Sequence, residues 1–94
     1  MNQTEYSLGA VVYSKMGRDK GRYFAVVELI DENFVMIADG DLRRLANPKK
    51  KKIKHLQLKP DKLTNIAVKL ESGQKIFDSE LRSALDSLDY TKQA

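Results

Sequence analysis

Apolar residues in the first part of the chain fall into short runs separated by polar and glycine-containing segments. Three of these runs are rich in β-branched and aromatic residues, and each predicts a β-strand. They occupy residues 8–13, 23–30 and 34–38. The third run is apolar on both faces, which favours a central strand. Residues 51–58 carry apolar side chains at Ile53, Leu56 and Leu58, and we interpret them as a closing strand.

The pattern changes at Pro60, after which apolar residues recur at the spacing of an amphipathic helix. This first helix has Leu63, Ile66, Ala67 and Leu70 on one face. Pro60 and Asp61 suit its first turn, and residues 72–73 suit its end. A second helix is indicated by Asp78 as its N-cap and Glu80 near the positive end of its dipole. Its apolar face holds Leu81, Ala84, Leu85 and Leu88.

Turn residues separate the predicted strands. Gly17 and Gly21 bracket three charged residues, which suits a solvated hairpin turn with positive φ at the glycines. Residues 31–33 and 39–41 also have turn composition. Residues 42–45 suit either a short strand or a turn of helix. Residues 46–50 are interpreted as a loop, because Pro48 cannot donate to a strand ladder.

Four or five short strands with no helix between them predict a mainly β fold with C-terminal helices. We expect a small SH3-like barrel over residues 6–59, since closure removes exposed sheet edges. Residues 60–90 form the helical extension, with one or two short α-helices that pack on the barrel or against each other. The ends of the chain, residues 1–5 and those from about Tyr90 onward, are expected to be loose. With 94 residues the chain has room for one small core.

Basic residues concentrate in the first two thirds of the chain. Residues 1–62 hold 13 of the 17 Lys and Arg but 8 of the 13 Asp and Glu, a net charge of +5, whereas residues 63–94 carry −1. Nine basic side chains lie within residues 43–62, with Asp61 as their only acidic neighbour. Such clustering is typical of a nucleic-acid partner. A solvated loop held open by repulsion would be the simpler interpretation of the lysine run 49–52.

The residue types argue against an enzyme and against a bound cofactor. The chain contains no cysteine and a single histidine, His55, which has no recognisable nucleophile or carboxylate partner in the sequence around it. Phosphate-binding glycine loops and calcium-loop spacing are absent from the sequence. We see no signal peptide and no apolar run of membrane-spanning length, so we expect a cytoplasmic protein without a membrane partner.

The hairpin carries a resemblance to a known family. The segment Gly17-Arg18-Asp19-Lys20-Gly21, followed by an apolar strand and preceded by Gly9 and Val11-Val12, resembles a KOW motif. The residue three positions after Gly21 is Phe24, where the motif commonly has a second glycine. With the later Asp39-Gly40 and the basic run into Lys54-His55-Leu56, the chain resembles KOW-bearing large-subunit ribosomal proteins of archaea and eukaryotes and their small bacterial relatives. The resemblance covers roughly residues 6–59 and implies an SH3-like fold.

Cationic side chains of the hairpin and of the later basic segment are the candidate RNA-binding residues. Lysines near a phosphate backbone release counterions, and arginines can fork onto phosphate or stack on an unpaired base. The candidates are Arg18, Lys20, Arg22, Arg43, Arg44, Lys49, Lys50, Lys51, Lys52, Lys54 and His55. Tyr13 and Tyr23 could also stack on bases. We place Tyr23 in the core and leave Tyr13 open.

These residues predict a non-enzymatic module that binds RNA, and the resemblance implies ribosomal RNA and a ribosomal or ribosome-associated protein. The alternative is a protein-interaction module that docks on the transcription or translation machinery, with the basic segment incidental. We expect a monomer when the partner is absent.

Overall fold

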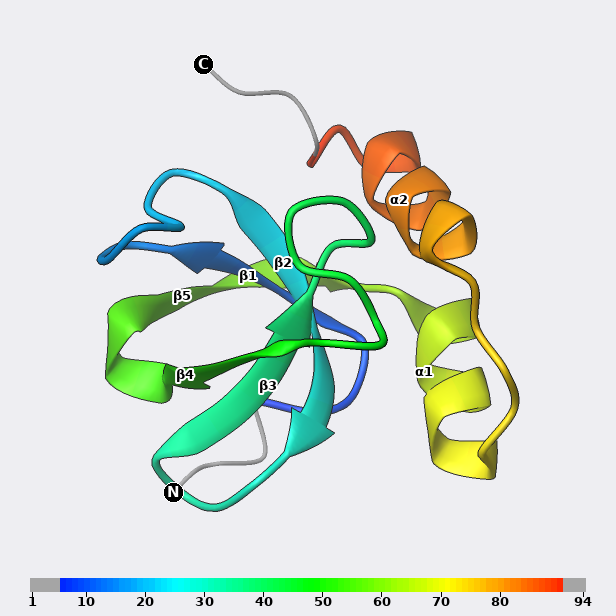
Figure 1. Ribbon diagram of the computed structural model, residues 1–94, viewed down its shortest axis with the longest axis horizontal. Helices are drawn as coiled ribbons and strands as arrows, with labels where there is room; N and C mark the ends of the chain where they lie inside the picture. Colours follow the sequence, from blue (N-terminus) through cyan, green and yellow to red (C-terminus); the bar gives the residue numbers. More distant parts are fainter. Residues whose placement is uncertain (1–5, 91–94) are drawn as a thin grey trace.

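The computed structural model describes residues 6–90, which form a curled antiparallel sheet followed by two helices (Figure 1). The strands are β1 (Ala10–Ser14), β2 (Tyr23–Leu29), β3 (Phe34–Ala38), β4 (Lys49–Lys52) and β5 (Leu56–Lys62). A short 3₁₀ helix, η2 (Ile53–His55), joins β4 to β5, and α1 (Thr64–Ser72) and α2 (Asp78–Ser87) follow. The strand order is β4-β3-β2-β1-β5, so β4 and β5 are the two end strands. The predicted mainly β, barrel-like fold with C-terminal helices is confirmed.

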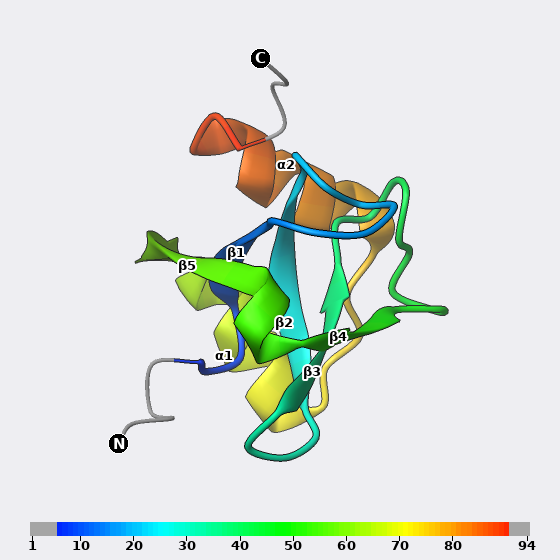
Figure 2. The ribbon, with the colours of Figure 1, turned by 90° about the vertical axis from the view of Figure 1, so that its left-hand side faces the viewer.

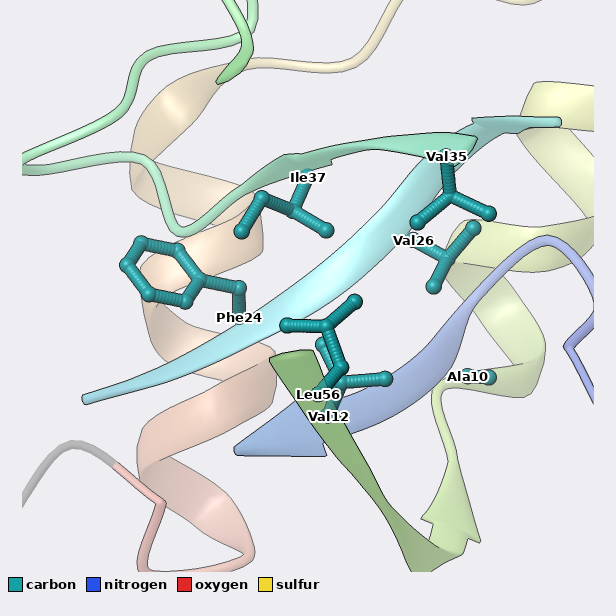
Figure 3. Packing of buried hydrophobic residues seen from close by; sticks show 7 residues of the cluster. All are labelled: Ala10, Val12, Phe24, Val26, Val35, Ile37 and Leu56. Atoms are coloured by element: carbon teal, nitrogen blue, oxygen red, sulfur yellow. The ribbon is translucent and has the colours of Figure 1, made fainter. Parts of the chain in front are cut away.

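Alternation along the strands builds two separate apolar clusters. One set of alternate residues points into the barrel, where Phe24 and Ile37 are fully buried (Figure 3). This inner cluster consists of Ala10, Val12, Phe24, Val26, Val35, Ile37 and Leu56. In β3 both sets of alternate residues are buried or half-buried, and the strand is an apolar run without a polar side, as the sequence pattern indicated.

The other face of the sheet receives the helices. Small side chains point outward there, with Val11, Ala25 and Ala38 all buried. They let the apolar faces of α1 and α2 approach the sheet, where Ile66, Leu81 and Leu85 complete a second cluster. Both helices pack on this outer face of the sheet (Figure 1, Figure 2). Packing on the sheet is one of the two arrangements that we predicted for them.

The turn between β1 and β2 has the predicted backbone conformation. Gly17 and Gly21 take φ values of 86° and 89°, a region that disfavours side chains with a Cβ atom. Strands β1 and β2 pair as expected, with Val12 opposite Phe24. We refer to residues 15–22 as the hairpin loop.

The prediction for residues 46–58 is wrong in two ways. Lys49–Lys52 is strand β4, paired with β3, although we had placed residues up to 50 in a loop. The predicted single closing strand is interrupted by η2, and β5 crosses to the opposite end of the sheet to pair with β1. Lysine has a low strand propensity, but pairing with the buried β3 overrides it. Residues 42–45 form neither of the elements expected for them and lie in a loop.

Pro60 and Asp61 also lie in a strand and not in the first turn of a helix. They belong to β5, and α1 begins at Thr64. The register between β1 and β5 shifts at this point: Val12 faces Leu58, but Ala10 faces Lys62. Extra residues in an end strand bulge away from its neighbour, so proline costs no ladder hydrogen bond there.

The helix ends agree with the prediction at α1 and differ at α2. Gly73, in the left-handed conformation, ends α1 as expected. At α2 the N-cap is Phe77, and Asp78 is the first helical residue. The Asp78 carboxylate instead accepts a hydrogen bond from the backbone N–H of Leu45, 2.8 Å away, because the 39–48 loop packs against this end of α2.

Gly40 allows this close packing, since a Cβ atom built there would lie 2.4 Å from the Asp78 carbonyl oxygen.

Tyr90 is ordered against the sheet: its ring packs on Tyr23 with centroids 4.9 Å apart, and its hydroxyl donates to Asp61 at 2.6 Å. This contradicts the expectation of a loose end from Tyr90. The expectations for residues 1–5 and 91–94 lie outside the described residues. Among residues 6–90, no helix has the length and apolar content needed to cross a membrane.

Candidate nucleic-acid interface

Three basic segments that are separate in the sequence meet in the fold. The hairpin loop touches the middle of β4, where the Lys51 ammonium donates to the Met16 carbonyl at 2.9 Å. It also touches η2, because the Lys15 N–H donates to the His55 carbonyl at 2.9 Å. The 39–48 loop joins them through Arg43, which lies 3.1 Å from the Asp19 carboxylate. Both loops occupy the same end of the molecule in Figure 2. We call the exposed cationic side chains of these segments the basic face.

Strand β4 sorts its four lysines by alternation. Lys51 lies opposite Val35 in the ladder and is buried, with only 8% of its surface exposed. Lys50 and Lys52 point the other way and are exposed. The Lys50 ammonium stands 4.6 Å from the centre of the Phe34 ring, a cation–π contact that keeps the charge accessible. The sequence presented four equivalent lysines, and the strand makes one of them structural.

Two of the predicted arginines are held by carboxylates. Arg43 donates through Nε and Nη2 to Asp19, whose side chain is almost completely buried. Arg22 lies 3.4 Å from Asp39 and 3.8 Å from Asp41. Asp39 in turn accepts backbone hydrogen bonds from Asp41 and Arg43 at 2.9 Å, which closes the turn that begins the 39–48 loop.

The remaining candidates are more open to solvent. His55 and Lys49 are half-buried. The exposed candidates are Arg18, Lys20, Arg44, Lys50, Lys52 and Lys54. The two tyrosines are half-buried and pack together, with Tyr13 and Tyr23 ring centres 5.1 Å apart. Tyr23 packs against the second apolar cluster. We had placed it in the core, and the structure shows it only partly buried there.

The sequence interpretation missed the acidic residues that organise the basic segments. Asp19 and Asp39 were assigned to turns, yet both are buried and hold arginines. A usable signal was present for Asp19, which is the one acidic residue in an otherwise basic loop. A buried carboxylate needs a paired charge or hydrogen bonds, so basic partners could have been expected.

Two side chains outside the basic face, Glu80 and Tyr90, have shifted pKa values. The Lys69 ammonium, hydrogen-bonded to Glu80, holds the pKa of that carboxyl below its ordinary value. The hydrogen bond to Asp61 raises the pKa of Tyr90 to about 12. No cluster of three or more His, Cys, Asp or Glu side chains suited to a metal ion occurs between residues 6 and 90.

Comparison with known proteins identifies a ribosomal protein as a relative of the chain. No family model matches the chain. The chain is similar to large ribosomal subunit protein eL14 of Hyperthermus butylicus: the two are 31% identical in an alignment 94 positions long, which covers 92% of this chain and 84% of that protein. The alignment thus extends beyond the hairpin into the helical part of the chain.

Proposed function

The chain belongs to the family of large ribosomal subunit protein eL14, and from that premise we propose that it binds ribosomal RNA as a ribosomal or ribosome-associated protein. The family agrees with the KOW-type resemblance of the hairpin. The module is non-enzymatic and needs no cofactor. It works in the cytoplasm and is a monomer when its partner is absent.

The observation that carries the proposal is the meeting of the hairpin loop, the 39–48 loop and β4 at one end of the barrel. Lys51 and the pair of Arg43 and Asp19 fix the three segments to one another. Cations from distant parts of the sequence can then act together on one phosphate backbone. Each lysine close to a phosphate releases condensed counterions, so affinity accumulates without reading of bases.

The candidates divide into two roles. Exposed side chains supply the phosphate contacts, and half-buried Lys49 and His55 border them. The contact residues are Arg18, Lys20, Arg44, Lys50, Lys52 and Lys54. Internally paired Arg22, Arg43 and Lys51 position the loops and contribute less contact of their own. This division supports a rigid arrangement of cations, which suits folded RNA because less order has to be created on binding.

The test uses two double variants that lower the net charge equally from +4. Lys20→Gln with Lys52→Gln removes one cation from the hairpin loop and one from β4, whereas Lys62→Gln with Lys75→Gln removes two exposed lysines elsewhere. Filter binding to a large-subunit ribosomal RNA transcript is measured at several salt concentrations. We expect the first variant to lose affinity and to reduce the salt slope by roughly 1.5 to 2, since each phosphate contact contributes about 0.9. The second variant should behave almost as the parent.

Equal affinities and slopes for the two variants would show that the basic face is not the RNA contact. The protein-interaction alternative has its own readout. If the protein binds a purified ribosomal protein or polymerase but not the transcript, docking on protein replaces RNA binding as the function.

A further inference from the structure

A pocket of about 300 Å³ lies between the sheet and α2, next to the basic face. We call it the seam pocket. Its walls come from the start of β2, from the 39–41 turn and from α2 with the residues that follow it. The residues that line it include Arg22, Tyr23, Asp41, Arg82, Ser83 and Tyr90. Its volume is at the lower end of the range for small-molecule pockets, so it suits a ligand the size of a single nucleotide.

The polar groups of the seam pocket include both hydrogen-bond donors and acceptors. Arg22 has a buried Nε that lacks a hydrogen-bond partner among residues 6–90, while its Nη2 pairs with Asp39. Arg82 donates to the Gly40 carbonyl at 2.6 Å, which leaves its guanidinium at the rim. Asp41 contributes a carboxylate whose side chain is 69% exposed. A ligand here must both donate and accept hydrogen bonds.

An aromatic wall completes the pocket. Tyr23 and Tyr90 pack with their ring centres 4.9 Å apart, and both are half-buried. The hydrogen bond from the Tyr90 hydroxyl to Asp61 fixes the second ring in place. A fixed aromatic surface favours a planar ligand, because stacking then costs little additional order.

These features exclude the simplest ligands. Three carboxylates, of Asp39, Asp41 and Asp86, would repel a free phosphate or a phosphate group of the RNA backbone. Two arginines in the same walls would repel a metal ion. A neutral planar heterocycle with donors on one edge and acceptors on another satisfies the walls best. Guanine fits because N1–H and the N2 amino group can donate to one carboxylate, while O6 and N7 accept from a guanidinium.

We propose that the seam pocket binds an unpaired guanine base of RNA, an inference that rests on the proposed RNA-binding function. Arg22 belongs both to the hairpin loop and to the pocket, so a strand whose phosphates lie on the basic face can place a base beside α2. Single-stranded bases are the part of RNA that proteins read by stacking and edge contacts. The basic face then supplies affinity, and the seam pocket supplies base selectivity.

The experiment measures base preference in two ways. Backbone amide signals are followed by NMR during titration with GMP, AMP, CMP and UMP, which share the phosphate and differ only in the base. Seven-nucleotide RNAs of uridine with a central G, A or C are compared by fluorescence anisotropy. We expect GMP to shift signals of Arg22, Tyr23 and Ser83, and the G-containing RNA to bind roughly tenfold more tightly than the others.

Filling the pocket provides the matched variants. Ser83 is exposed on α2, so Ser83→Phe blocks the pocket without disturbing the core, and Ser79→Phe places the same ring on α2 outside it. Ser83→Phe should abolish the preference for guanine and keep the salt-dependent binding, whereas Ser79→Phe should keep both. Asp41→Asn replaces one carboxylate oxygen, which accepts hydrogen bonds, with an amide NH₂ group, which donates them. This variant should reduce the preference for guanine without blocking the pocket.

The outcomes separate this inference from the proposed function. Equal binding of all bases with intact salt dependence, or a guanine preference that survives Ser83→Phe, overturns the seam pocket and leaves RNA binding standing. GMP binding that Ser83→Phe abolishes, with no binding of the ribosomal RNA transcript or of any short RNA, overturns both the proposed function and RNA as the source of the guanine. Failure of both titrations, with binding of the ribosomal RNA transcript intact, overturns the seam pocket alone.

Discussion

Two groups of cations in this protein differ in what surrounds them. In β4 the lysines form no ion pair within residues 6–90, and Lys50 and Lys52 are open to solvent. Around the 39–41 turn, Arg22 and Arg43 each lie against a buried carboxylate. The comparison teaches that a basic residue becomes a contact or a support according to the acidic groups within its reach. Charge density along the sequence does not distinguish the two roles.

The largest effect is expected where the 39–48 loop meets α2. Gly40→Ala places a Cβ atom against the Asp78 carbonyl, at a φ of 83° that already disfavours alanine. We expect a loss of about 3 kcal/mol in the free energy of unfolding, measured by urea denaturation. Gly21→Ala is the control, since its φ is similar and its Cβ would meet no atom within 4 Å. It should cost about 1 kcal/mol, and equal losses would refute the role of close packing.

The second-largest effect on stability is expected from removing the Asp19 carboxylate, which supports the hairpin loop. Asp19→Ala leaves Arg43 without its partner and deletes a charge-assisted pair in the hairpin loop. We expect the free energy of unfolding to fall by about 2 kcal/mol. Glu32→Ala, at an exposed turn, should change it by less than about 0.5 kcal/mol. If both variants are equally stable, the Asp19 pair does not support the loop.

Two adjacent lysines of β4 allow a sharper comparison. Lys51→Met removes the hydrogen bond to the Met16 carbonyl and should cost about 1 kcal/mol of stability, while the salt slope of RNA binding stays unchanged. Lys52→Met should leave stability within about 0.5 kcal/mol and reduce the salt slope by about 0.9. Denaturation and filter binding on the same samples provide both values. The reverse result would exchange the roles assigned to the two side chains.

The smallest effect concerns Tyr90 at alkaline pH. Its pKa is raised from 10.0 to about 12 by the hydrogen bond to Asp61. A raised pKa in the folded state stabilises the protein below pH 10, and this contribution is lost as pH rises from about 10 to 12. Tyr90→Phe should therefore lose less stability than the parent across that interval. In a pH titration followed by absorbance at 295 nm, the tyrosine ionisation at the highest pH should disappear in this variant. An unchanged titration curve would exclude this hydrogen bond.

Local chemistry made much of the fold predictable. The hairpin followed from Gly17 and Gly21, because positive φ is available to few other residues. Runs of apolar residues rich in β-branched and aromatic side chains identified β1, β2 and β3, because such side chains favour strands. The end of α1 followed from Gly73. In each of these cases a few neighbouring residues determine the conformation.

The rest depended on contacts between distant residues. Lys49–Lys52 becomes a strand through pairing with β3, and Pro60 fits β5 only because of the register shift against β1. The residues next to these segments in the sequence do not indicate that β3 and β1 are the strands with which they pair. The division of the basic residues into contacts and supports required the same information, since Arg43 meets Asp19 across 24 positions of sequence.

The place of β4 at the end of the sheet has a consequence for the protein on its own. An end strand exposes unpaired N–H and C=O groups, which can recruit the same strand of another copy. Two tetralysine strands brought together would set like charges opposite one another, and the repulsion opposes such pairing. The residues that favour a polyanion thereby also protect the free protein against stacking into fibres.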